Sequence, residues 1–100
     1  MHIVQLLLPL FDNQGEPFPD ATMRQIRDEL VARFGGVTAF RTPAEGVWSD
    51  HGRKVRDEVI LVEVMVESLD RSWWVHFRTQ LEGRLRQKSL VVRTLAAERL

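Results

Sequence analysis

Three polar residues stand within otherwise apolar segments and are the first candidates for chemistry. Gln5, Glu63 and Arg93 fall where a period-two pattern can place them among apolar neighbours on one side of a sheet. Buried polar groups must find hydrogen-bond partners. Two interpretations follow: a small pocket in which Glu63 acts as a base or orients a ligand, or a polar network that fixes how two copies pack. The run 90–92, Leu-Val-Val, leaves the facing of Arg93 open.

The histidines supply a weaker candidate. His2, His51 and His76 lack metal-binding spacing and the chain has no cysteine, so we expect no metal, and no motif calls for a cofactor. His76 lies one helical turn after Trp73 and one turn before Gln80, so these three residues could border a cleft with His76 as a proton acceptor. Simple packing is the more common explanation of such tryptophans.

The strand that carries Glu63 is the main element to explain. The segment from Asp57 to Ser68 has two largely apolar faces, which is typical of a strand in the middle of a sheet. One face holds Ile60, Val62, Val64 and Val66, and the other holds Val59, Leu61 and Met65, broken by Glu63 and Glu67. A chain of 100 residues cannot cover both faces with its own helices.

Two helices follow from apolar residues at helical spacing. Asp20 is expected to cap the first, and Gly35-Gly36 to end it. Asp70 is expected to cap the second. The buried stripes are predicted to be Met23, Ile26, Leu30 and Phe34 in the first helix, and Trp74, Phe77, Leu81 and Leu85 in the second.

The remaining segments predict strands, at about residues 2–8, 37–48 and 89–95. A turn at 49–52 joins the second of these to the central strand as a hairpin, and Pro43 should place that second strand at an edge. The order is β-α-β-β-α-β, so we predict one α+β domain over residues 1–100 with a ferredoxin-like fold. Right-handed crossovers give the strand order 4-1-3-2 with both helices on one face.

The other face of that sheet is expected to meet a second copy. If the turn at 49–52 has four residues, Thr38 lies opposite Glu63, and Phe40 lies opposite Leu61 on the same face. Covering roughly 400 Å² of apolar surface is worth on the order of 10 kcal/mol before association costs. We therefore predict a homodimer of the dimeric α/β-barrel type. The candidate ligand-binding residues are Gln5, Thr38, Phe40, Trp48, Glu63 and Arg93.

Composition limits the classes of partner. The chain has no net charge, which argues against general nucleic-acid binding, and the open face is mainly aliphatic where an RNA-binding sheet displays aromatic residues. Residues 71–100 nevertheless carry seven basic and two acidic side chains. This basic excess is either a solvated helix face or a site for an anionic ligand.

No membrane segment is expected, because no run of about 18 apolar residues occurs. The apolar start of the chain lacks the preceding basic residue and the following small-residue cleavage site of a signal peptide, so we predict a strand there. The absence of cysteine is compatible with a reducing environment, and we expect a cytoplasmic protein.

Three short motifs resemble a bacterial family of small uncharacterised domains. They are Gly46-Val-Trp48, the Arg53 to Asp57 stretch RKVRD, and the Gln87 to Leu90 stretch QKSL, where the family reads G-x-W, R-x-x-R-[ED] and Q-x-S-[VL]. The resemblance carries no activity. It implies that Trp48, Arg56 and Gln87 act together, with Gln87 bonding the hairpin backbone where helix meets strand, although structural roles explain the motifs equally well.

The sequence therefore predicts a small homodimeric domain that binds a small molecule or a protein partner. The alternative is a cofactor-independent oxygenase or isomerase of the dimeric barrel type, acting on a small hydrophobic substrate with Glu63 or His76 as proton acceptor. A weaker alternative is an interaction module whose edge strands pair with other proteins.

Overall fold

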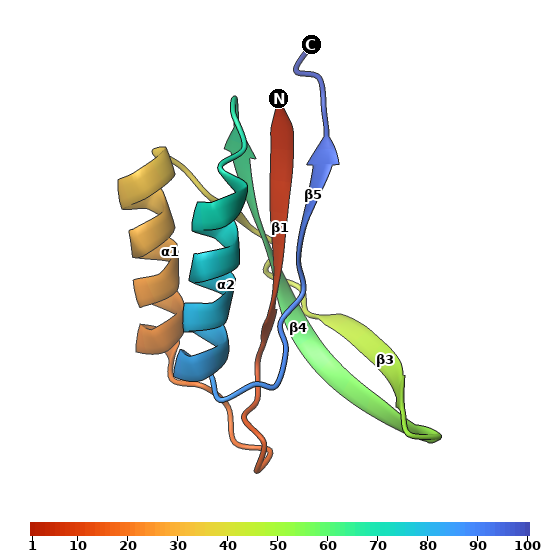
Figure 1. The fold of residues 1–100 in the computed structure, drawn as a ribbon. Helices are drawn as coiled ribbons and strands as arrows, with labels where there is room; N and C mark the ends of the chain where they lie inside the picture. Colours follow the sequence, from red (N-terminus) through yellow and green to blue (C-terminus); the bar gives the residue numbers. More distant parts are fainter.

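The computed structural model describes residues 1–100 as an antiparallel sheet with two helices packed on one of its sides (Figure 1). The fold is α+β, and none of its helices has the length and apolar character needed to cross a membrane. Along the chain the elements are β1 (His2–Pro9), α1 (Asp20–Phe34), β2 (Thr38–Ala39), β3 (Ala44–Asp50), β4 (Arg53–Val66), α2 (Arg71–Arg84) and β5 (Val92–Ala96).

The centre of the sheet is formed by β1 and β4, which pair along the whole of β1. The sheet runs β2-β4-β1-β5, and β3 also pairs with β4. Alternation in β4 separates its side chains as predicted, because Val62, Val64 and Val66 face the helices and are buried. They join Val4 and Leu6 of β1 in the core.

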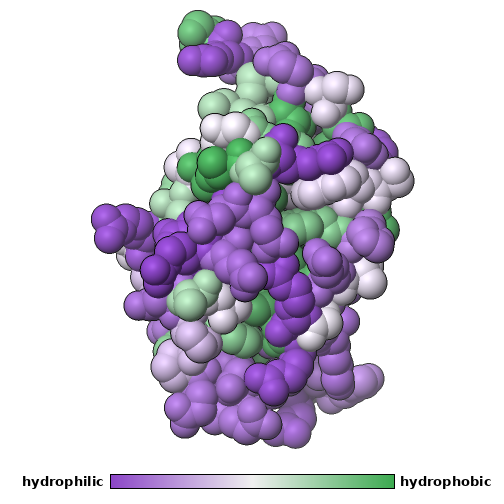
Figure 2. Space-filling model, turned by 90° about the vertical axis from the view of Figure 1, so that its left-hand side faces the viewer, coloured by the Kyte–Doolittle hydropathy of each residue, from purple (hydrophilic) through white to green (hydrophobic).

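Both helices use the predicted stripes. In α2 Trp74, Phe77 and Leu81 are buried, and so is Leu85 at its C-terminal cap. In α1 Ile26 and Leu30 are buried, and Met23 and Phe34 are only half-buried. The outer surface of this layer is largely hydrophilic, with small separated apolar spots (Figure 2). The exposed apolar side chains of this layer include Val31 at 43% and Val75 at 52%.

The helix ends follow the sequence with one exception. Asp70 caps α2 by accepting a hydrogen bond from the Trp73 backbone N–H at 3.1 Å, and Gly35 ends α1 in the left-handed region at φ 85°. The prediction that Asp20 caps α1 was wrong. The cap position is Pro19, and Asp20 is the first helical residue, where its charge still complements the helix dipole.

The predicted strand at 37–48 is split in two, so the sheet has five strands and the four-strand description was wrong. Residues 40–43 oppose only residues 60–61 of β4, because Ala39 pairs with Val62 and Ala44 pairs with Val59. Pro43 lies in this interruption and has no N–H to donate to the ladder.

The hairpin turn is also shorter than predicted. Asp50 pairs with Arg53, leaving a two-residue turn of His51 and Gly52 at φ 50° and 79°. Two positive φ angles are characteristic of a type I′ turn, whose twist matches that of the strands. The two extra residues between β2 and β3 compensate for the shorter turn, so Thr38 still pairs with Glu63 as predicted.

The β3–β4 hairpin extends beyond the helical layer (Figure 1). Its residues are mostly exposed, including Val47 at 48% and Trp48 at 41%. The connection from α2 to β5 turns up beside β1 (Figure 1), where the Leu7 backbone N–H donates to Val91 O at 3.0 Å. A groove lies between this connection and the hairpin.

Candidate functional site

The predicted polar residues form one row across the side of the sheet that faces away from the helices, here called the open face. Gln5 of β1 pairs with Glu63 of β4 on one side and with Arg93 of β5 on the other, and Glu63 pairs in turn with Thr38 of β2. This polar row, Arg93-Gln5-Glu63-Thr38, crosses four strands. The facing of Arg93, open in the sequence, is settled by its register with Gln5.

Gln5 links the two charged members of the row. Its Nε2 donates to Glu63 Oε2 at 2.7 Å, and its Oε1 accepts from Arg93 Nε at 2.7 Å. A carboxylate only accepts and a guanidinium only donates, so the two partners fix the orientation of the amide. Gln5 is 9% exposed, whereas Glu63 is half-buried and Arg93 exposed. Glu63 Oε1 and the terminal nitrogens of Arg93 make no hydrogen bond within the chain and are free to receive a ligand or a partner.

Apolar side chains border the polar row on both sides. Ile3 pairs with Met65 and Leu95 in the next row along the strands. On the other side Leu7 pairs with Leu61, and the Phe40 backbone N–H donates to Leu61 O at 2.8 Å. The most exposed apolar side chains among these are Met65 at 57%, Leu95 at 47% and Phe40 at 45%. The backbone of Phe40 is paired with Leu61, which is the predicted register, and Phe40 also lines a hollow at the edge of the sheet with Met23 and Ile60.

The open face leads into a groove beside the hairpin. This Trp48 groove has a volume of about 600 Å³ and lies between the hairpin and the α2–β5 connection. Its apolar lining includes Leu7, which pairs with Leu61 on the open face. The other lining residues are Pro9, Asn13, Trp48, Asp50, Val55, Asp57, Val59 and residues 87–91.

Trp48 in the wall of this groove is positioned by a hydrogen bond and by close packing on a glycine. Its Nε1 donates to Asp57 Oδ2 at 2.7 Å. Its ring lies over Gly46, where an added Cβ would come within 2.5 Å of Trp48 Cζ2. The glycine of G-x-W is therefore required by the position of the tryptophan two residues later. A fixed aromatic ring that is 41% exposed offers a surface on which a flat ligand can stack.

The three motifs meet at the Trp48 groove, although not through the residues expected. Trp48, Asp57, Gln87 and Ser89 all line it. Arg56 does not, because it pairs with Val47 on the other face of the hairpin and lies 3.8 Å from Glu45. The predicted bond from Gln87 to the hairpin backbone was wrong, since Gln87 Nε2 donates to Leu85 O at 3.0 Å.

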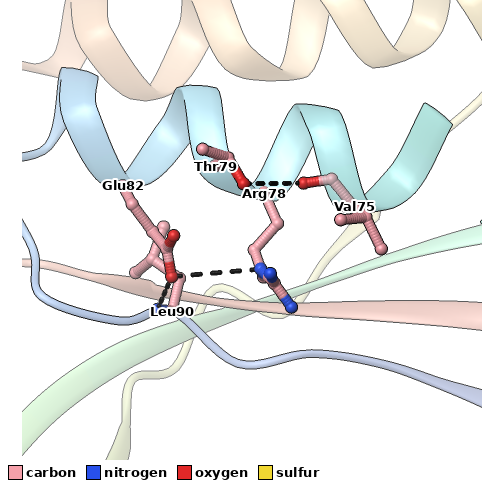
Figure 3. Close-up of polar contacts among 5 residues, drawn as sticks. All are labelled: Val75, Arg78, Thr79, Glu82 and Leu90. Carbon is pink, nitrogen blue, oxygen red and sulfur yellow. Dashed lines mark hydrogen bonds and ion pairs between the residues drawn. The ribbon is translucent and has the colours of Figure 1, made fainter. Parts of the chain in front are cut away.

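Glu82 positions the far wall of the groove. Its Oε2 accepts from the Leu90 backbone N–H at 2.9 Å and lies 4.0 Å from Arg78 Nε (Figure 3). Figure 3 shows Arg78 and Glu82 projecting from α2 toward the strands, while Thr79 turns back to bond Val75 O at 3.0 Å. The carboxylate thus fixes the chain just before β5. No sequence motif indicated this role for Glu82.

His76 lies in a different part of the molecule. It lines a shallow hollow of about 480 Å³ with Trp73 and Gln80, as the helical spacing predicted, together with Glu29 and Arg33. This hollow lies between α1 and α2, across the sheet from the polar row. His76 and Glu63 therefore cannot act on one substrate within a single chain. The chain also contains no cluster of three side chains placed to hold a metal ion.

Sequence signals for the groove were incomplete. Val55 and Asp57 were missed as lining residues, although Asp57 ends the R-x-x-R-[ED] motif. Their alternation with Val59 could have placed them on the open face had the strand been extended back to Arg53. The contribution of residues 87–91 had no local signal, because it depends on the path of the chain after α2.

Comparison with known proteins identifies the fold alone. No protein-family model and no curated protein sequence matches the chain. The solved structure of a phage SAM lyase in complex with S-methyl-5′-thioadenosine is similar, with a TM-score of 0.65 and 12% identity over 94% of this chain and 79% of that chain. A phage SAM lyase in the apo state gives a TM-score of 0.59 and 13% identity over 99% of this chain and 91% of that chain. The class that these likenesses define is a small α+β fold with an antiparallel sheet.

Proposed function

We propose that this protein is a small-molecule-binding domain that works as a homodimer, with the open faces of two copies packed together. In this proposal the chain has a ferredoxin-like arrangement and the pair forms a dimeric α/β barrel. The observation that carries the proposal is the open face itself, where apolar side chains flank a polar row of which Gln5 is already only 9% exposed.

Covering the apolar side chains of the open face is more favourable than leaving them in water. Monomers rarely expose contiguous apolar patches beyond a few hundred Å². Met65 and Leu95 are 57% and 47% exposed on one face, whereas the helical layer is mainly hydrophilic outside. A second copy is the simplest cover, because a two-fold axis buries the same patch on both subunits at once.

The charges of the polar row favour one orientation of that axis. Arg93 and Glu63 lie one strand to either side of Gln5, each about 4.8 Å away across the sheet. An axis parallel to β1 that passes over Gln5 would bring Arg93 opposite Glu63 of the partner subunit, and the reverse. An axis along the row would instead oppose like charges, which is unfavourable.

The Trp48 groove is the proposed ligand site. Its volume of about 600 Å³ falls within the range usual for small-molecule pockets, and it combines an exposed indole ring with polar side chains from two segments. The phage SAM lyase bound to S-methyl-5′-thioadenosine supports small-molecule binding on a similar fold. We propose that the motif residues Trp48, Asp57 and Gln87 contact the ligand.

A second candidate function is catalysis without a cofactor, as in an oxygenase or isomerase that acts on a small hydrophobic substrate. The observation in its favour is that Glu63 keeps Oε1 free while Gln5 holds Oε2. Such a carboxylate can accept a proton from a substrate bound between the two faces. The similar solved structures are of an enzyme, a lyase, which also supports this candidate.

Native mass spectrometry of the protein purified from its source tests both parts of the proposal. We expect a dimer, with extra mass from a retained small molecule that Trp48→Ala loses. The second experiment is a titration with S-methyl-5′-thioadenosine that is monitored by tryptophan fluorescence. The wild type is compared with Trp48→Phe, which lacks the indole ring of the groove. A monomer at micromolar concentration would refute the dimer.

Glu63→Gln separates the binding function from the catalytic one. Ligand retention should be unchanged in Glu63→Gln if the ligand lies only in the Trp48 groove, because Glu63 does not line that groove. Loss of the ligand would place Glu63 at the binding site, and Glu67→Gln is the matched control because Glu67 is exposed beyond the end of β4. Turnover of the retained molecule by the wild type but not by Glu63→Gln would favour the enzyme.

A further inference from the structure

A separate hollow opens between α1 and the sheet edge at β2. It has a volume of about 440 Å³, and its lining reaches the core, since Leu8 and Val62 are each only 1% exposed. The other apolar residues that line it are Leu10, Met23, Ala39, Phe40 and Ile60. The hollow lies where the ladder breaks after β2, so the edge of the sheet is interrupted beside it.

Three arginines line the same hollow. Arg24 and Arg27 come from α1, and Arg41 comes from the interruption between β2 and β3. None of the three forms an ion pair with a carboxylate of the chain. The only acidic residue in the lining is Asp20, so the hollow carries two excess positive charges.

The excess positive charge of the hollow suits an anionic ligand. Arg24 and Arg27 are three residues apart, which puts them on one side of α1, where their like charges repel weakly because both side chains are exposed to water. Arg41 adds a third positive charge at the same hollow. An anion bound among them would remove the repulsion, because guanidinium groups bind phosphate and carboxylate through paired hydrogen bonds.

We propose that this hollow, here called the arginine hollow, binds an amphipathic anion: a small apolar or aromatic body that carries one phosphate, sulfonate or carboxylate group. The apolar body would lie on Met23 and Ile60, and the anionic group would meet the arginines. The proposal is independent of the dimer and of the Trp48 groove, because it uses the side of the sheet that the helices cover and its edge at β2.

Isothermal titration calorimetry with 1-naphthyl phosphate tests the proposal directly. We expect one-to-one binding to the full chain, at least about tenfold tighter than that of inorganic phosphate, which lacks the apolar body, or of 1-naphthol, which lacks the charge. Equal affinity for inorganic phosphate would overturn the proposal, since it would indicate charge attraction alone. Absence of 1-naphthyl phosphate binding would overturn it as well.

Variants place the binding at the arginine hollow. The double variant Arg24→Gln, Arg27→Gln and the single variant Arg41→Gln should each weaken 1-naphthyl phosphate binding at least about tenfold. Arg99→Gln, an exposed arginine in the C-terminal tail, is the matched control and should leave the affinity unchanged. Equal weakening by the control would overturn the assignment. Circular dichroism melts of each variant check that the fold is intact. We expect it to be, because the substituted arginines are exposed and lie outside the core.

A second pair of measurements distinguishes the source of the anion. Met23→Gln changes the apolar lining without touching the charges, so it should weaken 1-naphthyl phosphate but not inorganic phosphate. Phosphatidylglycerol vesicles provide the same charge as a membrane surface. Vesicle binding that depends on Arg24 and Arg27, without binding of soluble 1-naphthyl phosphate, would assign the arginines to a membrane and overturn the small-molecule site.

Discussion

Gln5 Nε2 donates a hydrogen bond to Glu63 Oε2 at 2.7 Å in the centre of the open face. The same amide accepts a bond from Arg93 through its oxygen, so one neutral side chain joins an acid to a base. Hydrogen bonds to charged groups contribute more to stability than neutral ones. Gln5 is therefore the structural centre of the polar row, and Glu63 and Arg93 supply its free polar atoms.

Removing the amide of Gln5 should destabilise the protein. Gln5→Met keeps the length of the side chain but loses both bonds, and we expect the free energy of unfolding to fall by about 1–3 kcal/mol. Urea unfolding at fixed protein concentration measures this. Gln80→Met, at an exposed position of α2, is the control and should change the value by less than about 0.5 kcal/mol. Similar losses in the two variants would argue against a structural role of the row.

Gly46→Ala should displace Trp48. The added Cβ would collide with the indole ring at 2.5 Å, so the ring must leave and its Nε1 bond to Asp57 must break. We expect the Trp48 indole N–H resonance to shift in NMR spectra, ligand retention to be lost, and the free energy of unfolding to fall by about 1 kcal/mol.

Gly36→Ala is the control for this experiment, because a Cβ at Gly36 meets no atom within 4 Å. The Trp48 resonance should not move in that variant. An unchanged indole resonance in Gly46→Ala would contradict the packing described for the G-x-W motif.

Stability in acid should depend on Asp70. Its pKa is lowered from 3.8 because its carboxylate accepts hydrogen bonds from the Trp73 backbone N–H and the Ser72 hydroxyl. A lowered pKa in the folded state means that the contribution is complete above the unfolded pKa and is lost as the pH falls through the folded one. Asp70→Asn keeps a capping side chain without the charge. Its melting temperature should therefore depend less on pH below about pH 4 than that of the wild type, and parallel curves would contradict this.

Charge exchange tests the proposed axis of the dimer. Glu63→Arg alone should weaken the dimer at least about tenfold, because it places a second guanidinium group opposite Arg93 of the partner subunit. Combining Glu63→Arg with Arg93→Glu should restore the dimer. The Gln5 amide can flip, so that its oxygen faces the new guanidinium group and its nitrogen faces the new carboxylate. Size-exclusion chromatography with light scattering measures both variants. A double variant as weak as the single one would count against this axis.

Much of the fold could be predicted because it depends on local patterns. Alternation in β4 separated core valines such as Val62 from open-face residues such as Glu63, and the side chain of Asp70 marked the start of α2. Thr38 was placed opposite Glu63 for an incorrect reason. The shorter turn at His51-Gly52 and the extra residues before Ala44 cancel each other in the register.

The groove could not be predicted because it depends on tertiary contacts. Residues 87–91 reach the hairpin only through the path of the chain after α2, which Glu82 fixes by accepting from the Leu90 backbone N–H. Arg93 could not be assigned to a face because its flanking residues lack alternation. Pairing with Gln5 across β1 decides it.

Sedimentation equilibrium of the wild-type protein is the most direct test of the central claim that a second copy covers the open face. We expect a species of twice the 11.6 kDa chain mass at micromolar concentration, and Met65→Glu, which adds a charge to that face, should shift it to the monomer. A stable wild-type monomer at that concentration would contradict the claim.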